Sequence, residues 1–292
     1  MAYAPPLTLI GLISAYHGQT MPELPEVETT RRGLSPLVEG RVIESMVVRQ
    51  PQLRWPIPTT IQTLKNQPIR GLWRRGKWLV WDLDEGHMLW HLGMSGSFRG
   101  WVDPPAPGKH DHVDLIIKGG HTIRFTDPRR FGALLWHSES PDTHPMIARL
   151  GPEPLSDAFN GDYLWQQSRK RAIPVKSFVM NGAVVVGVGN IYASEALYAA
   201  GIRPGRAANR ISKPRYEALA QAIVRILNQA IEVGGTSLRD FTVGDGTPGY
   251  FGQSLTVYGR DGEPCLTNGC GATIKRVMIG QRSTFYCPRC QR

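Results

Sequence analysis

The sequence predicts an α+β protein with an N-terminal antiparallel β-sandwich and a flanking helix, then a helical domain, then a C-terminal β-hairpin held by cysteines. Three observations predict this order. Short β-rich runs fill residues 41–136, helical spacing follows residue 150, and the four cysteines form two close pairs near the end. With 292 residues and 41% hydrophobic content, the chain can form at least two domains that each bury a core.

The first helix is predicted from Glu23 to about Val38. Apolar side chains recur there at helical spacing, and Gly40 ends the run. Pro22 and Pro25 suit the opening of a helix, and the helix dipole favours acidic residues in its first turns.

Six β-rich runs follow, and Gly, Pro and Asp separate them. They are Val42 to Val48, Trp78 to Leu83, His87 to Leu92, Val113 to Ile117, Thr122 to Phe125 and Ala133 to Trp136. Short strands at such spacing are typical of an antiparallel sandwich.

The pattern changes to helices after residues 150–154 (LGPEP), so we expect the first domain boundary there. The clearest helix covers residues 213–232, where Ser212 can cap the start and Gly234-Gly235 follows the end. We expect a catalytic sandwich domain over residues 21–150, a helical domain over 151–255 and a cysteine module over 256–292. Residues 1–20 have no Lys or Arg before their apolar centre, unlike a signal peptide, and are interpreted as a removable leader or a misassigned start.

The charge balance indicates a polyanionic partner. The formal net charge is +10 and the isoelectric point is near 9.7, which suits nucleic acid or, as the alternative, an anionic membrane surface. No apolar run approaches the ~18 residues that a membrane helix needs.

The cysteines are spaced as metal ligands. Cys265 and Cys270 form one pair and Cys287 and Cys290 the other, and two thiolate pairs joined by a hairpin suit one tetrahedral, structural Zn²⁺. The alternative is two disulfides, or four thiols without a function. Disulfide frameworks are spread across secreted domains, whereas these clustered cysteines indicate a metal site in a reducing cytoplasm. The hairpin between the pairs carries three cations and no acid, which suits a DNA groove.

The stretch Met21 to Glu28 (MPELPEVE) carries the candidate nucleophile. If the chain begins at Pro22, that residue offers a secondary amine, whose pKa near the ~7.7–8.0 of an α-amino group leaves much of it unprotonated and nucleophilic. Glu23 stands beside it as an acid or base. The alternative is that these residues only open a helix. With residues 1–20 attached, Pro22 is a tertiary amide without a nucleophilic lone pair, and we expect the extended chain to be inactive.

Three segments of the chain are similar to those of a known family: PELPEVE, GVGNIYASEALYAAGI and GQRSTFYC. Segments like these follow one another in the same order in formamidopyrimidine-DNA glycosylases, the bacterial enzymes that excise oxidised purines. The chain resembles that family over residues 21–292. It departs in having four residues, not two, within the first cysteine pair. The resemblance implies a helix-two-turn-helix domain, a zinc-ribbon finger, and four catalytic residues: Pro22 as nucleophile, Glu23 for protons, Lys77 near the sugar, and Arg282 on a phosphate beside the lesion.

The resemblance also implies DNA contacts at six positions. They are Met94 in the emptied base stack, Phe131 as an intercalating wedge, Arg129 on the orphaned cytosine, Asn190 on phosphates with helix-start N–H groups, and His110 and Arg171 on the backbone. Four of these positions, and Arg282, also have an alternative. Met94 and Phe131 can pack in the core, Arg282 and the run Arg169 to Arg171 with Lys176 can form a solvated face, and His110 with His112 can bind a metal. A dinucleotide-binding turn at Gly187 and Gly189 is disfavoured, because Tyr192 stands where a third glycine is needed.

The resemblance implies a bifunctional glycosylase and abasic-site lyase that acts as a monomer in the bacterial cytoplasm, at the nucleoid. The partner is duplex DNA with an oxidised purine opposite cytosine, and Zn²⁺ is the only cofactor. The segment Gly244 to Gly252 is expected to close over the base.

Two alternatives remain. One is an endonuclease VIII-type enzyme for oxidised pyrimidines, which has Gly in the place of Leu24. The other is a zinc-ribbon DNA-binding protein without catalysis.

Overall fold

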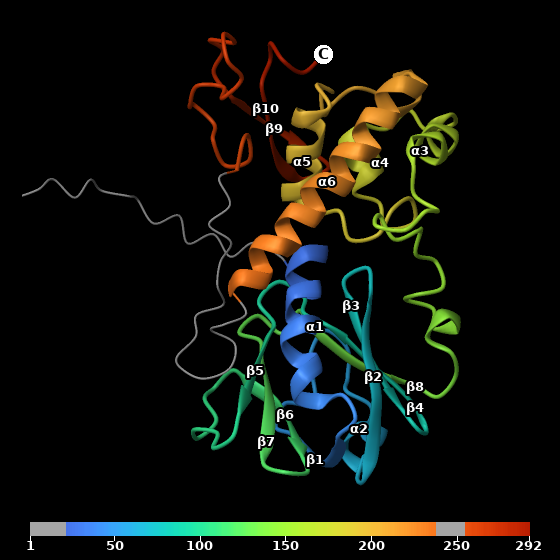
Figure 1. Cartoon of the computed structure of the whole chain (residues 1–292), viewed down its shortest axis with the longest axis vertical. Coiled ribbons are helices and arrows are strands. Elements are labelled where there is room, and N and C mark those ends of the chain that lie inside the picture. Colours follow the sequence, from blue (N-terminus) through green and yellow to red (C-terminus); the bar gives the residue numbers. More distant parts are fainter. Residues whose placement is uncertain (1–21, 238–254) are drawn as a thin grey trace, which may run out of the picture.

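The computed structural model describes residues 22–237 and 255–292, so the extension 1–20 and the segment Gly244 to Gly252 lie outside the described residues. The β-sheet and the N-terminal helices lie at one end of the molecule, and the later helices with the C-terminal hairpin lie at the other (Figure 1). Two helices, α1 (Leu24–Val38) and α6 (Lys213–Ser237), contact each other between the two halves.

The predicted first helix is confirmed as α1. Its apolar side chains Leu24, Val27, Leu34 and Val38 are fully buried. The helix ends before Gly40, whose φ of 72° is the left-handed conformation that glycine adopts at little cost.

Eight strands form one antiparallel sheet in the order β5-β7-β6-β1-β2-β3-β4-β8. Their bounds are β1 Val42–Val48, β2 Gln67–Arg75, β3 Trp78–Leu83, β4 Gly86–His91, β5 Ser97–Trp101, β6 Asp111–Ile117, β7 His121–Thr126 and β8 Ala133–His137. The short helix α2 (Thr59–Thr63) lies between β1 and β2, and a 3₁₀ turn (Pro141–Thr143) follows β8.

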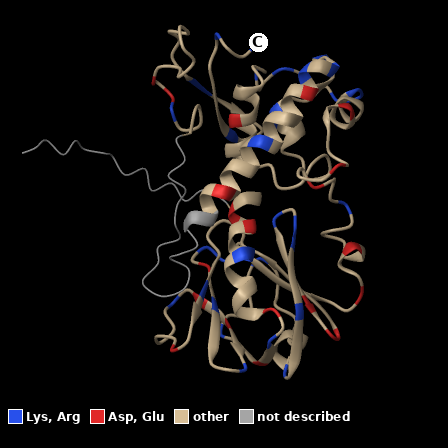
Figure 2. Cartoon of the chain, viewed as in Figure 1, with Lys and Arg blue, Asp and Glu red and all other residues tan. Residues whose placement is uncertain are grey.

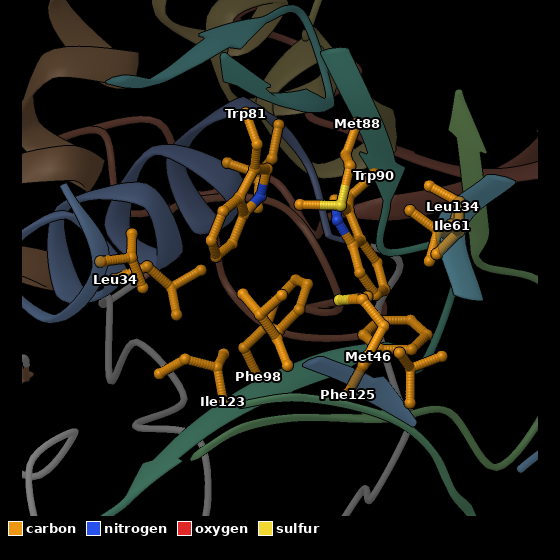
Figure 3. Packing of buried hydrophobic residues seen from close by; sticks show 14 of the residues in the cluster. Leu34, Met46, Ile61, Trp81, Met88, Trp90, Phe98, Ile123, Phe125 and Leu134 are labelled. Carbon is orange, nitrogen blue, oxygen red and sulfur yellow. The ribbon is translucent and has the colours of Figure 1, made fainter. Parts of the chain in front are cut away.

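The sheet folds over on itself around a large apolar core. In Figure 3, Trp81 and Trp90 from β3 and β4 face Phe98 and Phe125 from β5 and β7. The rings of Trp90 and Phe98 meet edge to face with centroids 5.0 Å apart. The predicted sandwich is therefore confirmed.

Two strands were not predicted, and each has a local reason. β2 contains Pro68 and Gly71, and a register shift between Ile69 and Gly71 breaks the alternation of apolar and polar residues. β5 contains Gly100, where an added Cβ would lie 2.7 Å from Leu37 of α1, so glycine allows the helix to approach the strand.

The second half is helical, as predicted. It contains α3 (Gly161–Ser168), α4 (Val175–Val179), α5 (Asn190–Ala199), a 3₁₀ turn (Ala208–Arg210) and α6, around a second apolar core. The expectation that Gly234-Gly235 ends the last helix is wrong, because α6 continues to Ser237. Contact between α6 and α1 accounts for this, since tertiary packing outweighs the low helix propensity of glycine.

The predicted hairpin is also confirmed. It consists of β9 (Lys275–Ile279) and β10 (Arg282–Tyr286), and β10 packs against α5. Lys and Arg occur on both halves of the molecule, so the positive charge is not confined to one domain (Figure 2). Within the described ranges, no helix is long and apolar enough to cross a membrane.

Candidate active site

The start of α1 docks on the glycine turn that precedes α5. The N–H of Leu24 donates to the carbonyl of Gly187 at 3.1 Å. Gly187 has a φ of 81°, and an added Cβ would lie 2.5 Å from the Cβ of Leu24. Only glycine fits this contact, which places Pro22 and Glu23 of the β half beside the helical half.

The carboxylate of Glu23 binds the first N–H groups of α5. Its side chain is buried, with Oε2 accepting from Gly189 at 2.8 Å and Oε1 accepting from Ile191 at 3.0 Å. A negative charge is favoured at a helix N-terminus. An added Cβ at Gly189 would lie 2.2 Å from Cδ of Glu23, so this glycine makes room for the carboxylate.

This contact corrects one expectation from the sequence. The N–H groups at the start of α5 were expected to be exposed and to bind DNA phosphates. For Gly189, Ile191 and Tyr192 this is wrong, because Glu23 already accepts from all three.

Glu23 and Lys77 lie close enough to shift each other's protonation. Burial raises the pKa of the Glu23 carboxyl above its ordinary value, and the charge of Lys77 opposes that shift. Burial lowers the pKa of the Lys77 ammonium, and Glu23 opposes it in turn. Lys77 also lines a cleft between the two halves with His91, whose pKa burial lowers to about 4. The pair therefore joins a carboxyl that protonates more readily than usual with an amine that deprotonates more readily.

The turn that carries Lys77 is held by Glu153, a residue that the sequence analysis assigned only to a domain boundary. Glu153 accepts from the N–H of Gly76 at 2.6 Å and from the guanidinium of Arg74 at 2.7 Å. Gly76 has a φ of 59°. No local pattern marked Glu153, because its partners lie 77 and 79 residues away.

Lys176 joins the helical half to the hairpin. It is 1% exposed, and its Nζ donates to Asn190 Oδ1 at 2.6 Å and to Thr284 Oγ1 at 2.7 Å. Asn190 in turn donates to the carbonyl of Ser283 at 3.1 Å. Burial lowers the pKa of Lys176 to about 7.

The basic run near Lys176 does not form one surface. Lys176 is buried, and Arg169 donates to the carbonyls of Trp165 and Ile211. Arg171 is half-buried, and its guanidinium has no hydrogen bond or ion pair within the described residues. The alternative of a solvated face is therefore wrong for Lys176, while the DNA contact expected for Arg171 stays a prediction.

Arg282 is exposed at the start of β10, and its charge lowers the pKa of both Lys77 and Lys176. The structure thus brings together Glu23, Lys77 and Arg282, which lie far apart in the sequence. It adds Lys176 as a buried neighbour that the sequence had placed on a surface.

The two loops expected to insert into DNA carry accessible apolar tips. Phe131 is 43% exposed and Met94 is partly exposed. The guanidinium of Arg129 lies over the Phe131 ring, 5.0 Å from its centroid. The alternative that Phe131 packs in the core is therefore excluded.

His110 lies in a hollow with the cations Arg49, Lys109 and Arg130. The alternative of a metal pair with His112 is not supported, because His112 is buried with Nε2 2.8 Å from the carbonyl of Asp127.

The four cysteines form one cluster that fits zinc. All four sulfur atoms lie within 4.8 Å of one another, and none forms a disulfide. The distances Cys265–Cys290 (3.8 Å) and Cys270–Cys287 (3.5 Å) are near the roughly 3.8 Å that a tetrahedral site with Zn–S bonds of about 2.3 Å requires. Among the residues that the structure describes, these four are the only set of three or more ligands that could hold a metal ion. The prediction of one structural zinc ion is confirmed.

Lys77 lines an interdomain cleft and lies near the buried carboxylate of Glu23. Two loops expose apolar tips, and four cysteines that fit zinc lie beside a basic hairpin. These features indicate a class of protein, a DNA glycosylase with a C-terminal zinc finger. Comparison with known proteins gives the family. Models of the formamidopyrimidine-DNA glycosylase N-terminal domain, its H2TH domain and the zinc finger found in FPG and IleRS match residues 21–134, 150–242 and 262–292. The chain belongs to the formamidopyrimidine-DNA glycosylase family.

Relatives and solved structures agree with this assignment. The chain is 56% identical to formamidopyrimidine-DNA glycosylase of Alcanivorax borkumensis and 54% identical to that of Magnetococcus marinus, over 93% of this chain and all of each relative. The Lactococcus lactis Fpg in complex with abasic-site DNA superposes with a TM-score of 0.82 at 32% identity, covering 92% of this chain and 99% of that one. The MutM (Fpg) protein of Thermus thermophilus gives 0.79 at 37% identity, covering 92% and 98%.

Proposed function

We propose that this chain removes oxidised purines from duplex DNA, where they lie opposite cytosine, and then cleaves the strand at the abasic site. The observation that supports this most is the convergence of Glu23, Lys77 and Arg282 beside Pro22. A base-excision enzyme must extrude its target, because the sugar carbon C1′ is shielded in the stack. The exposed tips Met94 and Phe131 suit that step.

The first chemical step uses the Pro22 nitrogen. When the chain begins at Pro22, its lone pair attacks C1′ and the C1′–N9 bond breaks, so the base leaves with the bonding electrons and takes up a proton. The ring bond between C1′ and O4′ then opens to give an iminium at C1′. The raised pKa of Glu23 suits it to give O4′ the proton that this opening requires.

The second stage is elimination. The iminium makes the C2′ proton acidic, and its loss expels the 3′ phosphate; a further proton loss expels the 5′ phosphate. Lys77 and Arg282 supply positive charge where these phosphates leave. Because the nucleophile and these charges belong to the protein, the reaction requires no organic cofactor. The zinc ion, held by Cys265, Cys270, Cys287 and Cys290, stabilises the hairpin that carries Arg282 and takes no part in the chemistry.

We propose further that the protein acts as a monomer in the bacterial cytoplasm, at the nucleoid. We also keep the domains at residues 21–150, 151–255 and 256–292. The matched family segments have similar limits and support this division.

The test is cleavage of three end-labelled duplexes that carry an oxidised purine opposite cytosine, an oxidised pyrimidine, or no lesion, with protein that begins at Pro22. We expect cleavage of the purine-lesion duplex, with phosphate left on both sides of the gap. Preference for the pyrimidine lesion would favour the endonuclease VIII-type alternative. Binding without cleavage would favour a non-catalytic DNA-binding protein.

A further inference from the structure

A buried carboxylate connects the two loops that carry the apolar tips. Asp127 is 0% exposed. Its Oδ1 accepts from the hydroxyl of Ser95 at 2.5 Å, and its Oδ2 accepts from the N–H of Gly132 at 2.7 Å. Ser95 follows Met94 directly, and Gly132 follows Phe131, so this one side chain binds the residue next to each tip.

The two loops also touch through their backbones. Gly93 has a φ of 63°, and an added Cβ would lie 2.3 Å from the carbonyl carbon of Phe131. The Ser95 hydroxyl accepts from the N–H of Arg129 at 3.1 Å while it donates to Asp127. The loops therefore form one unit, although 32 residues of chain separate Ser95 from Asp127.

Among the described residues, the carboxylate is held by neutral donors. Within residues 22–237 and 255–292, Asp127 forms no ion pair, and the donors to its side chain are the neutral Ser95 hydroxyl and the Gly132 N–H. Burying a carboxylate is costly unless its oxygens are well hydrogen-bonded. Removal of either donor would leave one oxygen of this buried carboxylate without its hydrogen bond. The carboxylate therefore constrains both loops strongly.

We propose that Ser95 and Asp127 are positioning residues that hold Met94 and Phe131 at a fixed separation, so that both enter the duplex as one wedge. This rests on the proposed function, in which these two side chains fill the space of the extruded base. If the two loops moved independently, each would lose conformational entropy when it inserted into the duplex. Because the loops are linked, that entropy is already lost on folding, and insertion costs less free energy.

The test is Ser95→Ala, with Ser97→Ala as the matched control, because Ser97 makes no side-chain hydrogen bond among the described residues. A 2-aminopurine next to the lesion reports unstacking of the duplex by its fluorescence. We expect Ser95→Ala to slow the fluorescence rise and lesion excision about tenfold, the rate equivalent of one lost buried hydrogen bond. Cleavage of a preformed abasic site, which has no base to extrude, should fall less than about threefold.

A double-mutant cycle separates positioning from general damage. If Ser95 acts through the wedge, Ser95→Ala should have little further effect in a Phe131→Ala background. Asp127→Asn, which keeps the shape and removes the charge, should repeat the pattern if Ser95→Ala lowers the melting temperature too far for assay. Additive losses, or equal losses on lesion and abasic DNA, would overturn the proposal. All of these proteins begin at Pro22, and failure of that protein without further substitution to excise any lesion would instead overturn the proposed function.

Discussion

Among single residues, Glu23 holds the most constrained position in the site. It belongs to the β half, yet its carboxylate binds the first N–H groups of α5 in the helical half. We expect Gly189→Ala to displace this carboxylate, because the new Cβ would lie 2.2 Å from Cδ of Glu23. Excision should fall by at least about 10²-fold, the usual contribution of a positioned acid or base.

Gly205→Ala is the control for that substitution. An added Cβ at Gly205 meets only the side chain of Ile279, at 3.8 Å, so activity should stay within about twofold of the parent. Full activity of Gly189→Ala in the lesion-cleavage assay would mean that the position of the Glu23 carboxylate is not needed for excision.

Lys176 gives a prediction about pH. Its pKa is lowered to about 7 by burial, while the unfolded chain has the ordinary value of 10.5. Between these values the unfolded chain holds more protons, so this residue makes the free energy of unfolding rise as pH rises from about 7 toward 10.5. Urea denaturation at several pH values should show a flatter pH dependence in this window for Lys176→Met. An unchanged slope would mean that the Lys176 ammonium keeps its charge in the folded protein.

At the scale of elements, the hairpin β9–β10 depends on the cysteine cluster at its base. Cys287→Ser should lose zinc and weaken DNA binding by roughly tenfold or more, because the cations Lys275, Arg276 and Arg282 would no longer be held in one arrangement. Zinc content and DNA affinity should be measured together. Chelation followed by added zinc should restore binding to the parent and not to the variant. Full DNA affinity of zinc-free protein would exclude the hairpin from the binding surface.

Sequence periodicity predicted the elements that follow a regular pattern. It located α1 and six strands, and it missed β2 and β5, where a register shift and Gly100 interrupt the alternation. It also ended α6 too early, because the contact between α6 and α1 joins segments almost 200 residues apart and leaves no local pattern.

The site was predicted only in part for a similar reason. Cysteine spacing identified the metal ligands, since all four lie within 26 positions of one another. The carboxylate of Glu23 meets α5 across 166 residues, and Lys176 meets β10 across 108, so no local pattern could show these partners. Lys176 looked like part of a basic surface because burial is not visible in a run of charged residues.

In the whole molecule, the proposed mechanism requires that two halves meet around one amine, the Pro22 nitrogen. The β half supplies Pro22, Glu23 and Lys77, the helical half supplies the N–H groups that bind Glu23, and the hairpin supplies Arg282. The net charge of +10 attracts DNA to the molecule, and such attraction weakens as salt rises.

Borohydride trapping is the most direct test that the Pro22 nitrogen is the nucleophile. Protein that begins at Pro22 and protein that begins at Met1 are each incubated with purine-lesion duplex and sodium borohydride, and the adduct is mapped by peptide mass. We predict a covalent adduct on the Pro22 nitrogen for the first protein and none for the second, in which that nitrogen is an amide. An adduct on another residue, or lesion excision by the extended chain while residues 1–21 remain attached, would contradict the account.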